Sequence, residues 1–322
     1  MPLLTSTYRA PRWLPGGHLQ TVWAARLVPL PEVAYRRERW TTPDGDFIDV
    51  DFAQPEPADP AARVLVLFHG LEGDSRSHYA RSTMHHFAER GWRAAVVHFR
   101  GCSGEPNRLL RAYHSGDSDE GDWVLRTVHR RWPAARLHAV GISLGGNMLA
   151  KWLGERGEDA AFVTAAASVG SPLDLVAGGH AIGRGFNMLY TRMFLATLKA
   201  KARHKAERFG YAVDAAALRS ARDLYDFDNL YTAPVHGFRD TLDYWTRASA
   251  KPLLANVRVP HLVLNARNDP FVPASSLPTV AEVSSEVVLE QPDEGGHIGF
   301  ASGRFPGELR FLPERLDEFF RG

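Results

Sequence analysis

Ser143 lies in a short motif whose spacing suits nucleophilic catalysis. In the segment HAVGISLGGNML it stands between Gly141 and Gly145, with an apolar run before it and a helix-like run after it. A serine on a sharp strand-to-helix turn exposes its hydroxyl at the carboxyl edge of a sheet, and flanking glycines leave room for that turn. The pattern predicts a nucleophilic serine. The backbone amide of Leu144, at the start of the helix, is then predicted to bind negative charge that develops on a substrate.

A serine hydroxyl needs a neighbouring base, and two later loops supply candidates. Asp269 follows the apolar run 261–267 in LNARNDPFVP, and His297 follows the run 285–293 in QPDEGGHIGF. We expect His297 to act as the general base and Asp269 to orient its imidazole, since this order of residues after the serine is one known arrangement. Asp174, which follows the run 161–170, stays open as an alternative acid.

A second oxyanion donor is expected in the loop after the first buried strand, within FHGLEGDSRSHY. Leu71, directly after His69 and Gly70, is the predicted donor through its backbone amide. We expect His69 to brace this loop rather than to transfer a proton. The alternative interpretation of the serine motif is a tight strand-to-helix turn that carries an incidental serine. Cys102 has no strand–turn–helix context and is predicted to be a small packed residue.

The elements that must position these residues alternate along the first half of the chain. Short apolar runs at 62–70, 92–99, 137–142 and 161–170 predict buried parallel strands, separated by helices at about 77–90 and 117–131. Residues 37–53 predict a β-hairpin, and Asp117 with Glu120 has the spacing of a capping box. This alternation predicts an α/β fold with a mostly parallel, doubly wound sheet.

The alternation stops over residues 172–248, which carry only helical patterns, and strands return at 261–267 and 285–293 before a closing helix at 312–320. We expect one domain of 1–322, with a core of 1–171 and 249–322 and a helical cap inserted at 172–248. Two interpretations stay open for the apolar positions Met188, Phe194 and Leu198: packing within the cap, or lining an acyl pocket. A basic stretch is either a solvated helix face or a dock for anionic lipid or an acidic substrate; it comprises Lys199, Lys201, Arg203, Lys205 and Arg208.

Composition limits the remaining classes. The formal net charge is +1 and 44% of residues are hydrophobic, which gives no global field for nucleic acid and enough apolar surface for a core. The single cysteine excludes an internal disulfide. Neither a signal peptide nor a transmembrane run is expected, so we predict a soluble cytoplasmic protein. No metal-ligand spacing, P-loop or dinucleotide fingerprint is present, so no metal and no nucleotide cofactor are predicted.

These motifs together resemble the α/β-hydrolase superfamily, and within it the YheT-like branch of esterases. The resemblance rests on GGHLQT (16–21), FHGLEGDSRSHY, HFRGCSGEPNR, YHSGDSDE, GISLGGNMLAKWLGE, NARNDPFVP and GGHIGF, which span nearly the whole chain. It implies a triad of Ser143, Asp269 and His297, hydrolysis of small-molecule carboxylic esters and no cofactor. Because eukaryotic relatives include phospholipid lipases, it also admits acyl lipids and peripheral membrane contact.

Two alternative functions remain open at this stage. The same triad supports acyl transfer to an alcohol or thiol if a cap excludes water. A non-catalytic binding protein on the same fold is the alternative from another class, and the complete set of three triad residues argues against it.

Overall fold

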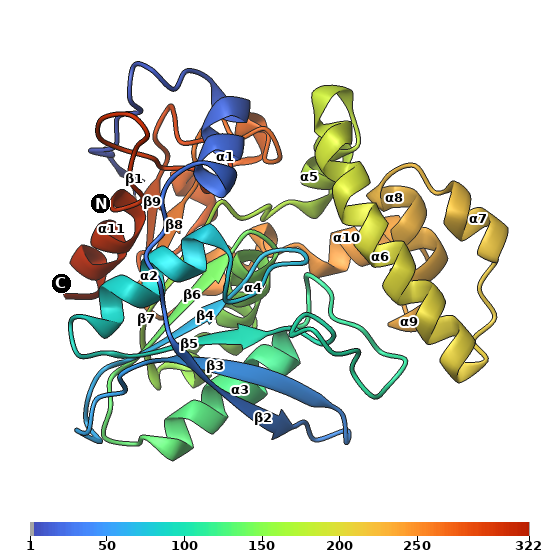
Figure 1. Ribbon diagram of the computed structural model, residues 1–322, viewed down its shortest axis with the longest axis horizontal. Helices are drawn as coiled ribbons and strands as arrows, with labels where there is room; N and C mark the ends of the chain where they lie inside the picture. The colour runs from blue at the N-terminus through green and yellow to red at the C-terminus, as the bar shows by residue number, and fades with distance from the viewer. Residues whose placement is uncertain (1–2, 322) are drawn as a thin grey trace.

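The computed structural model describes residues 3–321. Within them one nine-stranded sheet has the order β1-β9-β8-β7-β6-β4-β5-β3-β2 (Figure 1). The strands are β1 (Leu3–Leu4), β2 (Tyr35–Thr41), β3 (Phe47–Ala53), β4 (Val64–Phe68), β5 (Arg93–His98), β6 (Leu137–Ile142), β7 (Val163–Val169), β8 (His261–Leu264) and β9 (Val287–Glu290).

The sheet is parallel except at one edge. There β2 and β3 form the predicted hairpin, and β3 pairs antiparallel with β5. Every other neighbouring pair is parallel, which confirms the predicted α/β fold class. The two-residue strand β1, which pairs with β9, was not predicted because a run of two leucines carries no periodic signal.

Helices α2, α3, α4 and α11 pack on the two faces of the sheet. The α-helices are α1 (Gly17–Arg26), α2 (His78–Ala88), α3 (Ser118–Arg131), α4 (Leu144–Arg156), α5 (Leu175–Ile182), α6 (Met188–Phe209), α7 (Ala215–Ser220), α8 (Leu224–Phe227), α9 (Ala233–Val235), α10 (Thr241–Ala248) and α11 (Phe311–Arg321). Successive side chains of a strand point to opposite faces. Val66 of β4 accordingly packs in the cluster that contains α3 and α4 residues, and Leu67 in the cluster that contains α2 and α11 residues.

Between β7 and β8 the chain forms the helical elements α5 to α10, which extend beyond the carboxyl ends of the strands (Figure 1). We call residues 172–248 the helical insertion. Its own small clusters, around Trp245 and around Tyr231, bury fewer side chains than either face of the sheet. No helix within residues 3–321 combines the length and apolarity needed to cross a membrane.

The predicted capping box at the start of α3 is wrong. Asp117 is the N-cap residue, but its side chain caps no amide of the helix and instead binds Arg111. The carboxylate of Glu120 accepts a hydrogen bond from Arg100 Nε at 2.5 Å. Two arginines from the preceding loop therefore take both carboxylates, because a charge-assisted bond is stronger than a bond to a neutral amide.

The chain reverses its direction of travel across the sheet at β4. It runs from β4 to β5 on one side, and then crosses to β6 on the other side of β4. Ligands of open α/β sheets bind outside the carboxyl ends of strands at such a switch point. The loops that follow β4 and β6 carry Leu71 and Ser143, so both residues lie at this point.

Candidate active site

Ser143 occupies a strained turn between β6 and α4. Its φ is +52° and its ψ is −115°, outside the regions that residues with a side chain favour. The surrounding glycines are required by close backbone approach. A methyl group at Gly141 would lie 2.4 Å from the carbonyl oxygen of Gly145, and one at Gly145 would lie 2.5 Å from that of Phe68. The glycine spacing in the sequence is therefore a packing requirement of this turn.

Ser143, His297 and Asp269 form a continuous hydrogen-bonded row. Ser143 Oγ lies 3.0 Å from His297 Nε2, and His297 Nδ1 lies 2.8 Å from Asp269 Oδ2. An ionised carboxylate only accepts hydrogen bonds, so Nδ1 carries the proton and donates it to Asp269. In the neutral ring Nε2 is then the acceptor that faces the serine hydroxyl. The other carboxylate oxygen of Asp269 accepts from the amides of Phe271 at 2.8 Å and Val272 at 3.3 Å.

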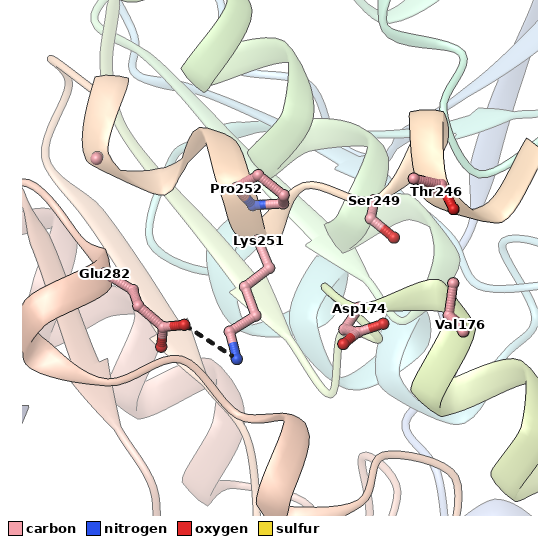
Figure 2. Close-up of a pocket in the computed structure, with 8 residues that line it drawn as sticks. Asp174, Val176, Thr246, Ser249, Lys251, Pro252 and Glu282 are labelled. Atoms are coloured by element: carbon pink, nitrogen blue, oxygen red, sulfur yellow. Dashed lines mark ion pairs between the residues drawn. The ribbon is translucent and has the colours of Figure 1, made fainter. Parts of the chain in front are cut away.

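The alternative acid, Asp174, has a different place. It is the N-cap of α5, where its side chain accepts a hydrogen bond from the amide of Ala177 at 3.0 Å. It also lines a cavity of about 550 Å³ beside Ser249, Lys251 and Glu282. Figure 2 shows Lys251 in this cavity directed towards Glu282, with which it forms an ion pair at 3.3 Å. The carboxylate that meets His297 is that of Asp269, and Asp174 makes a helix cap.

Two backbone amides near Ser143 carry no hydrogen-bond acceptor from residues 3–321: those of Leu71 and Leu144. His69 holds the first of these loops as predicted. Its side chain is fully buried, and burial lowers its pKa to about 3, so the ring is neutral. Its Nδ1 donates to the carbonyl of Gly70 at 2.7 Å, and its Nε2 accepts from the amide of Phe99 at 3.1 Å.

Helix α1 fixes the loop of His297, a role that sequence reasoning missed. Thr21 Oγ1 accepts a hydrogen bond from the amide of His297 at 2.8 Å, and Gln20 Oε1 accepts from the amide of Gly295 at 2.9 Å. A methyl group at Gly17 would lie 2.0 Å from the carbonyl oxygen of Asn268, next to Asp269. The segment GGHLQT contained all three residues. Nothing in the segment itself indicates that it supports a loop near residue 297, so only its position next to His297 in space reveals the role.

Aromatic side chains extend from His297 towards the helical insertion. The ring of Phe271 lies 4.3 Å from that of His297, and the ring of Tyr190 on α6 lies 4.7 Å from Phe271. Phe194 packs against the same cluster. Leu198 instead packs in the separate cluster around Tyr231, and Met188 lines an outer groove. Of the three apolar positions left open by the sequence, Phe194 is thus the one packed against the cluster that contains Phe271.

An ion pair joins α6 to the loop of Leu71. Lys201 Nζ lies 2.8 Å from Glu72 Oε1, and Tyr113 Oη donates to the same oxygen at 2.8 Å. Tyr113 Oη also accepts from the amide of Glu72 at 2.9 Å, which holds this residue at a φ of +55°. Cys102 packs beside this group, with Sγ 3.8 Å from Lys201 Nζ, and burial raises the pKa of the Cys102 thiol to about 12.

The predicted basic face of α6 is not a single surface. Lys201 is paired with Glu72, and Lys205 is buried, where its Nζ donates to the carbonyl of Arg111 at 2.6 Å. Lys199 donates to the carbonyls of Arg219 and Ala221. These three lysines therefore fasten the helix to its surroundings. Within residues 3–321 no group of three or more His, Cys, Asp or Glu side chains is arranged to hold a metal ion.

Comparison with known proteins gives consistent relatives over most of the chain. YheT of Escherichia coli, whose name describes it as a candidate esterase, is 38% identical over 94% of this chain and 89% of its own length. Phospholipase ABHD3 of Homo sapiens is 30% identical over 99% of this chain and 79% of its own. A monoacylglycerol lipase of Saccharomyces cerevisiae is 27% identical over 89% of this chain and 63% of its own.

The fold has solved counterparts as well. The Pyrococcus furiosus esterase Pf2001 superimposes with a TM-score of 0.56 at 17% identity, covering 90% of this chain and 91% of that one. The family model for the alpha/beta hydrolase fold matches residues 63–303, which include all three members of the hydrogen-bonded row. The chain belongs to the alpha/beta hydrolase family and to its YheT-like branch.

Proposed function

We propose that this protein hydrolyses carboxylic esters through an acyl-enzyme formed on Ser143. The observation that carries the proposal is the row from Ser143 Oγ to His297 Nε2 at 3.0 Å and from His297 Nδ1 to Asp269 at 2.8 Å. The two unoccupied amides of Leu71 and Leu144 beside the serine support it, because acyl transfer needs donors for the oxyanion. The relatives named as an esterase, a phospholipase and a lipase support an ester or lipid as substrate.

In the first half of the reaction Ser143 Oγ bonds to the ester carbonyl carbon while its proton passes to His297 Nε2. The carbonyl oxygen becomes an oxyanion and accepts hydrogen bonds from the amides of Leu71 and Leu144. The bond from this carbon to the alcohol oxygen then breaks, and the leaving alkoxide takes the proton from His297. Asp269 stabilises the imidazolium that exists between these two transfers.

In the second half a water molecule replaces the alcohol. His297 Nε2 removes a proton from the water as its oxygen bonds to the acyl carbon. The bond to Ser143 Oγ then breaks, and Oγ recovers the proton from His297, which frees the carboxylic acid. Phe271 packs on His297, and Tyr190 and Phe194 belong to the apolar cluster around Phe271, which favours an acyl chain over a polar group at this side of the site.

The test is labelling with a fluorophosphonate, which reacts with activated serines, followed by peptide mapping. We expect one labelled residue, Ser143. The Ser143→Ala variant should lose label and lose on the order of 10⁴–10⁶ in kcat on a short-chain ester. Its unfolding midpoint should stay unchanged, because the side chain is small. Label at another serine, or more than about a tenth of the activity in Ser143→Ala, would refute the proposal.

A further inference from the structure

Two segments of the chain carry cations but no carboxylates. Residues 9–31 hold three arginines and residues 184–206 hold six lysines and arginines, and neither segment contains an aspartate or glutamate. The whole chain holds 37 acidic residues among 322. The first segment includes α1, and the second covers the approach to α6 and most of that helix. Lys201 and Arg203 pair with acids outside their segment, Glu72 and Glu207, so the charge that matters here is that of the arginines without such a partner.

The fold brings these two segments together. His18 Nδ1 on α1 lies 3.2 Å from Tyr190 Oη on α6, and the ring of His18 lies 4.7 Å from that of Phe186. Figure 1 shows α1 and the junction of α5 with α6 at the same end of the molecule, above the carboxyl ends of the strands. The two acid-free segments thus meet where His18 contacts Phe186 and Tyr190.

Large apolar side chains are exposed on both segments. The apolar rim, as we call it, consists of Leu19 (53% exposed), Val22 (40%), Phe186 (57%), Leu189 (49%) and Met193 (55%). The spacing within α1 is i, i+3 and within α6 is i, i+4, so on each helix the apolar residues share a face. Three exposed arginines, Arg26, Arg184 and Arg192, accompany them, and none has an ion-pair partner among residues 3–321.

The apolar rim borders the catalytic histidine. The rings of Phe186 and Tyr190 lie 6.2 Å apart, and Tyr190 packs on Phe271, which packs on His297. On the other segment Thr21, one residue before Val22, accepts the hydrogen bond from the His297 amide. A continuous series of aromatic contacts therefore leads from the exposed rim to the site of acyl transfer.

A cationic groove lies next to the rim on α6. It has a volume of about 520 Å³, and Arg192, Lys199 and Arg222 line it together with Met188 and Leu195. Cations above an apolar floor suit a phosphate headgroup with acyl chains beneath it. A second copy of this chain fits worse. A symmetric interface through the rim sets the same patch against itself, so the unpaired Arg184 and Arg192 of each copy would face the same cations of the other.

We propose that the apolar rim docks on the surface of an anionic lipid bilayer, so that acyl-ester lipids enter the site from the membrane. The substrate part of this proposal rests on the proposed function. Exposed apolar side chains flanked by cations form the surface that lies in a membrane interface, and charge strengthens the docking to anionic lipid. The enzyme would thus take lipid esters from the bilayer and short soluble esters from water, using the same serine.

Vesicle flotation of the Ser143→Ala protein tests the docking without turnover. The probes are vesicles of phosphatidylcholine and vesicles of phosphatidylcholine mixed with phosphatidylglycerol. We expect strong association with the mixed vesicles, weak association with phosphatidylcholine alone, and loss of the difference at high salt because exposed charges are screened.

Two double variants and two matched controls assign the surface. Leu189→Ser with Met193→Ser should lower the partition coefficient on both vesicles about tenfold or more. Arg184→Gln with Arg192→Gln should lower it about tenfold on mixed vesicles alone. The controls are Leu242→Ser on α10, which is 49% exposed, and Arg239→Gln with Arg247→Gln, whose side chains are 83% and 60% exposed. We expect the controls to bind like the parent protein.

Activity measurements connect docking to substrate supply. These measurements use protein that retains Ser143. The rim variants should keep their turnover of a soluble short-chain ester and lose turnover of an ester embedded in mixed vesicles. Failure of the proposed function would appear as no turnover of either ester, with vesicle binding still intact. The docking proposal fails if the parent protein does not float with mixed vesicles or if rim and control variants bind alike. It also fails if Leu189→Ser with Met193→Ser converts a dimer to monomers and leaves vesicle binding unchanged.

Discussion

A methyl group has no room at Gly141, Gly145 or Gly146 around Ser143, whereas α6 leaves Leu189 and Met193 about half exposed to solvent. Ring contacts from Phe186 through Tyr190 and Phe271 to His297 connect the two regions, yet the two are packed very differently. In the proposed mechanism the turn after β6 must hold Ser143 Oγ at a fixed point, and close contacts surround its glycines. The outer face of the helical insertion has no such requirement and can retain apolar surface for contact with another phase.

The difference in packing indicates that the two regions should respond differently to small displacements. If Ser143 is the nucleophile, as proposed, a displacement of about 1 Å at the turn should cost on the order of 10²-fold in rate, because attack needs aligned atoms. On the insertion, the same displacement changes which surface is presented but leaves the reacting atoms in place. Substitutions in the two regions should therefore separate into losses of chemistry and losses of docking or specificity.

After the loss of Ser143 itself, the largest effect should come from the carboxylate hydrogen-bonded to His297. Asp269→Asn is expected to lower kcat by on the order of 10²–10⁴, because an amide at this position favours the wrong imidazole tautomer. Asp174→Asn should lower kcat less than about tenfold, since asparagine caps α5 as well as aspartate does. Steady-state kinetics on one soluble ester compares them. A larger loss for Asp174→Asn would move the acid to the strand before the insertion.

Acid should destabilise the sheet through three buried histidines. His69, His138 and His261 are fully buried, and burial lowers their pKa values to about 3, 4 and 3. The pKa of a histidine in the unfolded chain is about 6.5. Below that pH the unfolded chain binds protons at these histidines, whereas in the folded chain they stay neutral. Stability is thus complete above that pH and falls as pH drops, by about 4 kcal/mol per pH unit for the three together.

Denaturant titrations at several pH values and constant ionic strength measure this slope. His138 is the residue to remove, because neither ring nitrogen has a hydrogen-bond partner among the described residues and its ring packs between Trp92 and Phe320. His138→Leu should reduce the slope below pH 6 by about 1.4 kcal/mol per pH unit. An unchanged slope in this variant would show that His138 does not resist protonation in the folded state.

The comparison also explains what the sequence could predict. The turn at Ser143, the buried strands and the late loops of Asp269 and His297 follow from local spacing, because one short segment specifies each of them. Gln20 and Thr21 support His297 across more than 270 positions, and Lys201 meets Glu72 across 129. No local pattern encodes such pairs. The capping box failed because arginines outside the helix bind both carboxylates: Arg100 binds Glu120 and Arg111 binds Asp117.

Identical substitutions in the two regions should have different costs. Gly145→Ala places a methyl group 2.5 Å from the carbonyl oxygen of Phe68 and 2.6 Å from that of His69, so backbone must move. We expect a loss of about 1–3 kcal/mol in unfolding free energy together with loss of turnover. Gly178→Ala in α5 meets Pro172 Cβ at 3.0 Å and the Phe271 carbonyl oxygen at 3.6 Å, an ordinary contact distance, and gains helix propensity, so its stability should stay within about 1 kcal/mol of the parent. Equal losses would mean that the turn is no tighter than the insertion.

The smallest effect tests whether the two regions act independently. Lys201 of α6 binds Glu72, whose neighbour Leu71 is the proposed oxyanion donor, so the insertion reaches the reacting atoms through this pair. Lys201→Met should lower kcat about tenfold, less than the roughly 10²–10³ lost with a whole oxyanion donor, because Tyr113 still holds Glu72. KM for a soluble ester should stay unchanged, since the amide acts on charge that develops after binding.

Lys201→Arg should restore most of this loss, because a guanidinium also pairs with the Glu72 carboxylate. Arg203→Met, two positions further along α6, removes an exposed cation whose partner is Glu207 at 3.8 Å and should leave kcat unaltered. If Lys201→Met and Arg203→Met behaved alike, the ion pair would only fasten the helix. If Lys201→Met raised KM and left kcat unchanged, the insertion would contribute to substrate binding alone, and the rate of the chemical step would not depend on the Lys201–Glu72 pair.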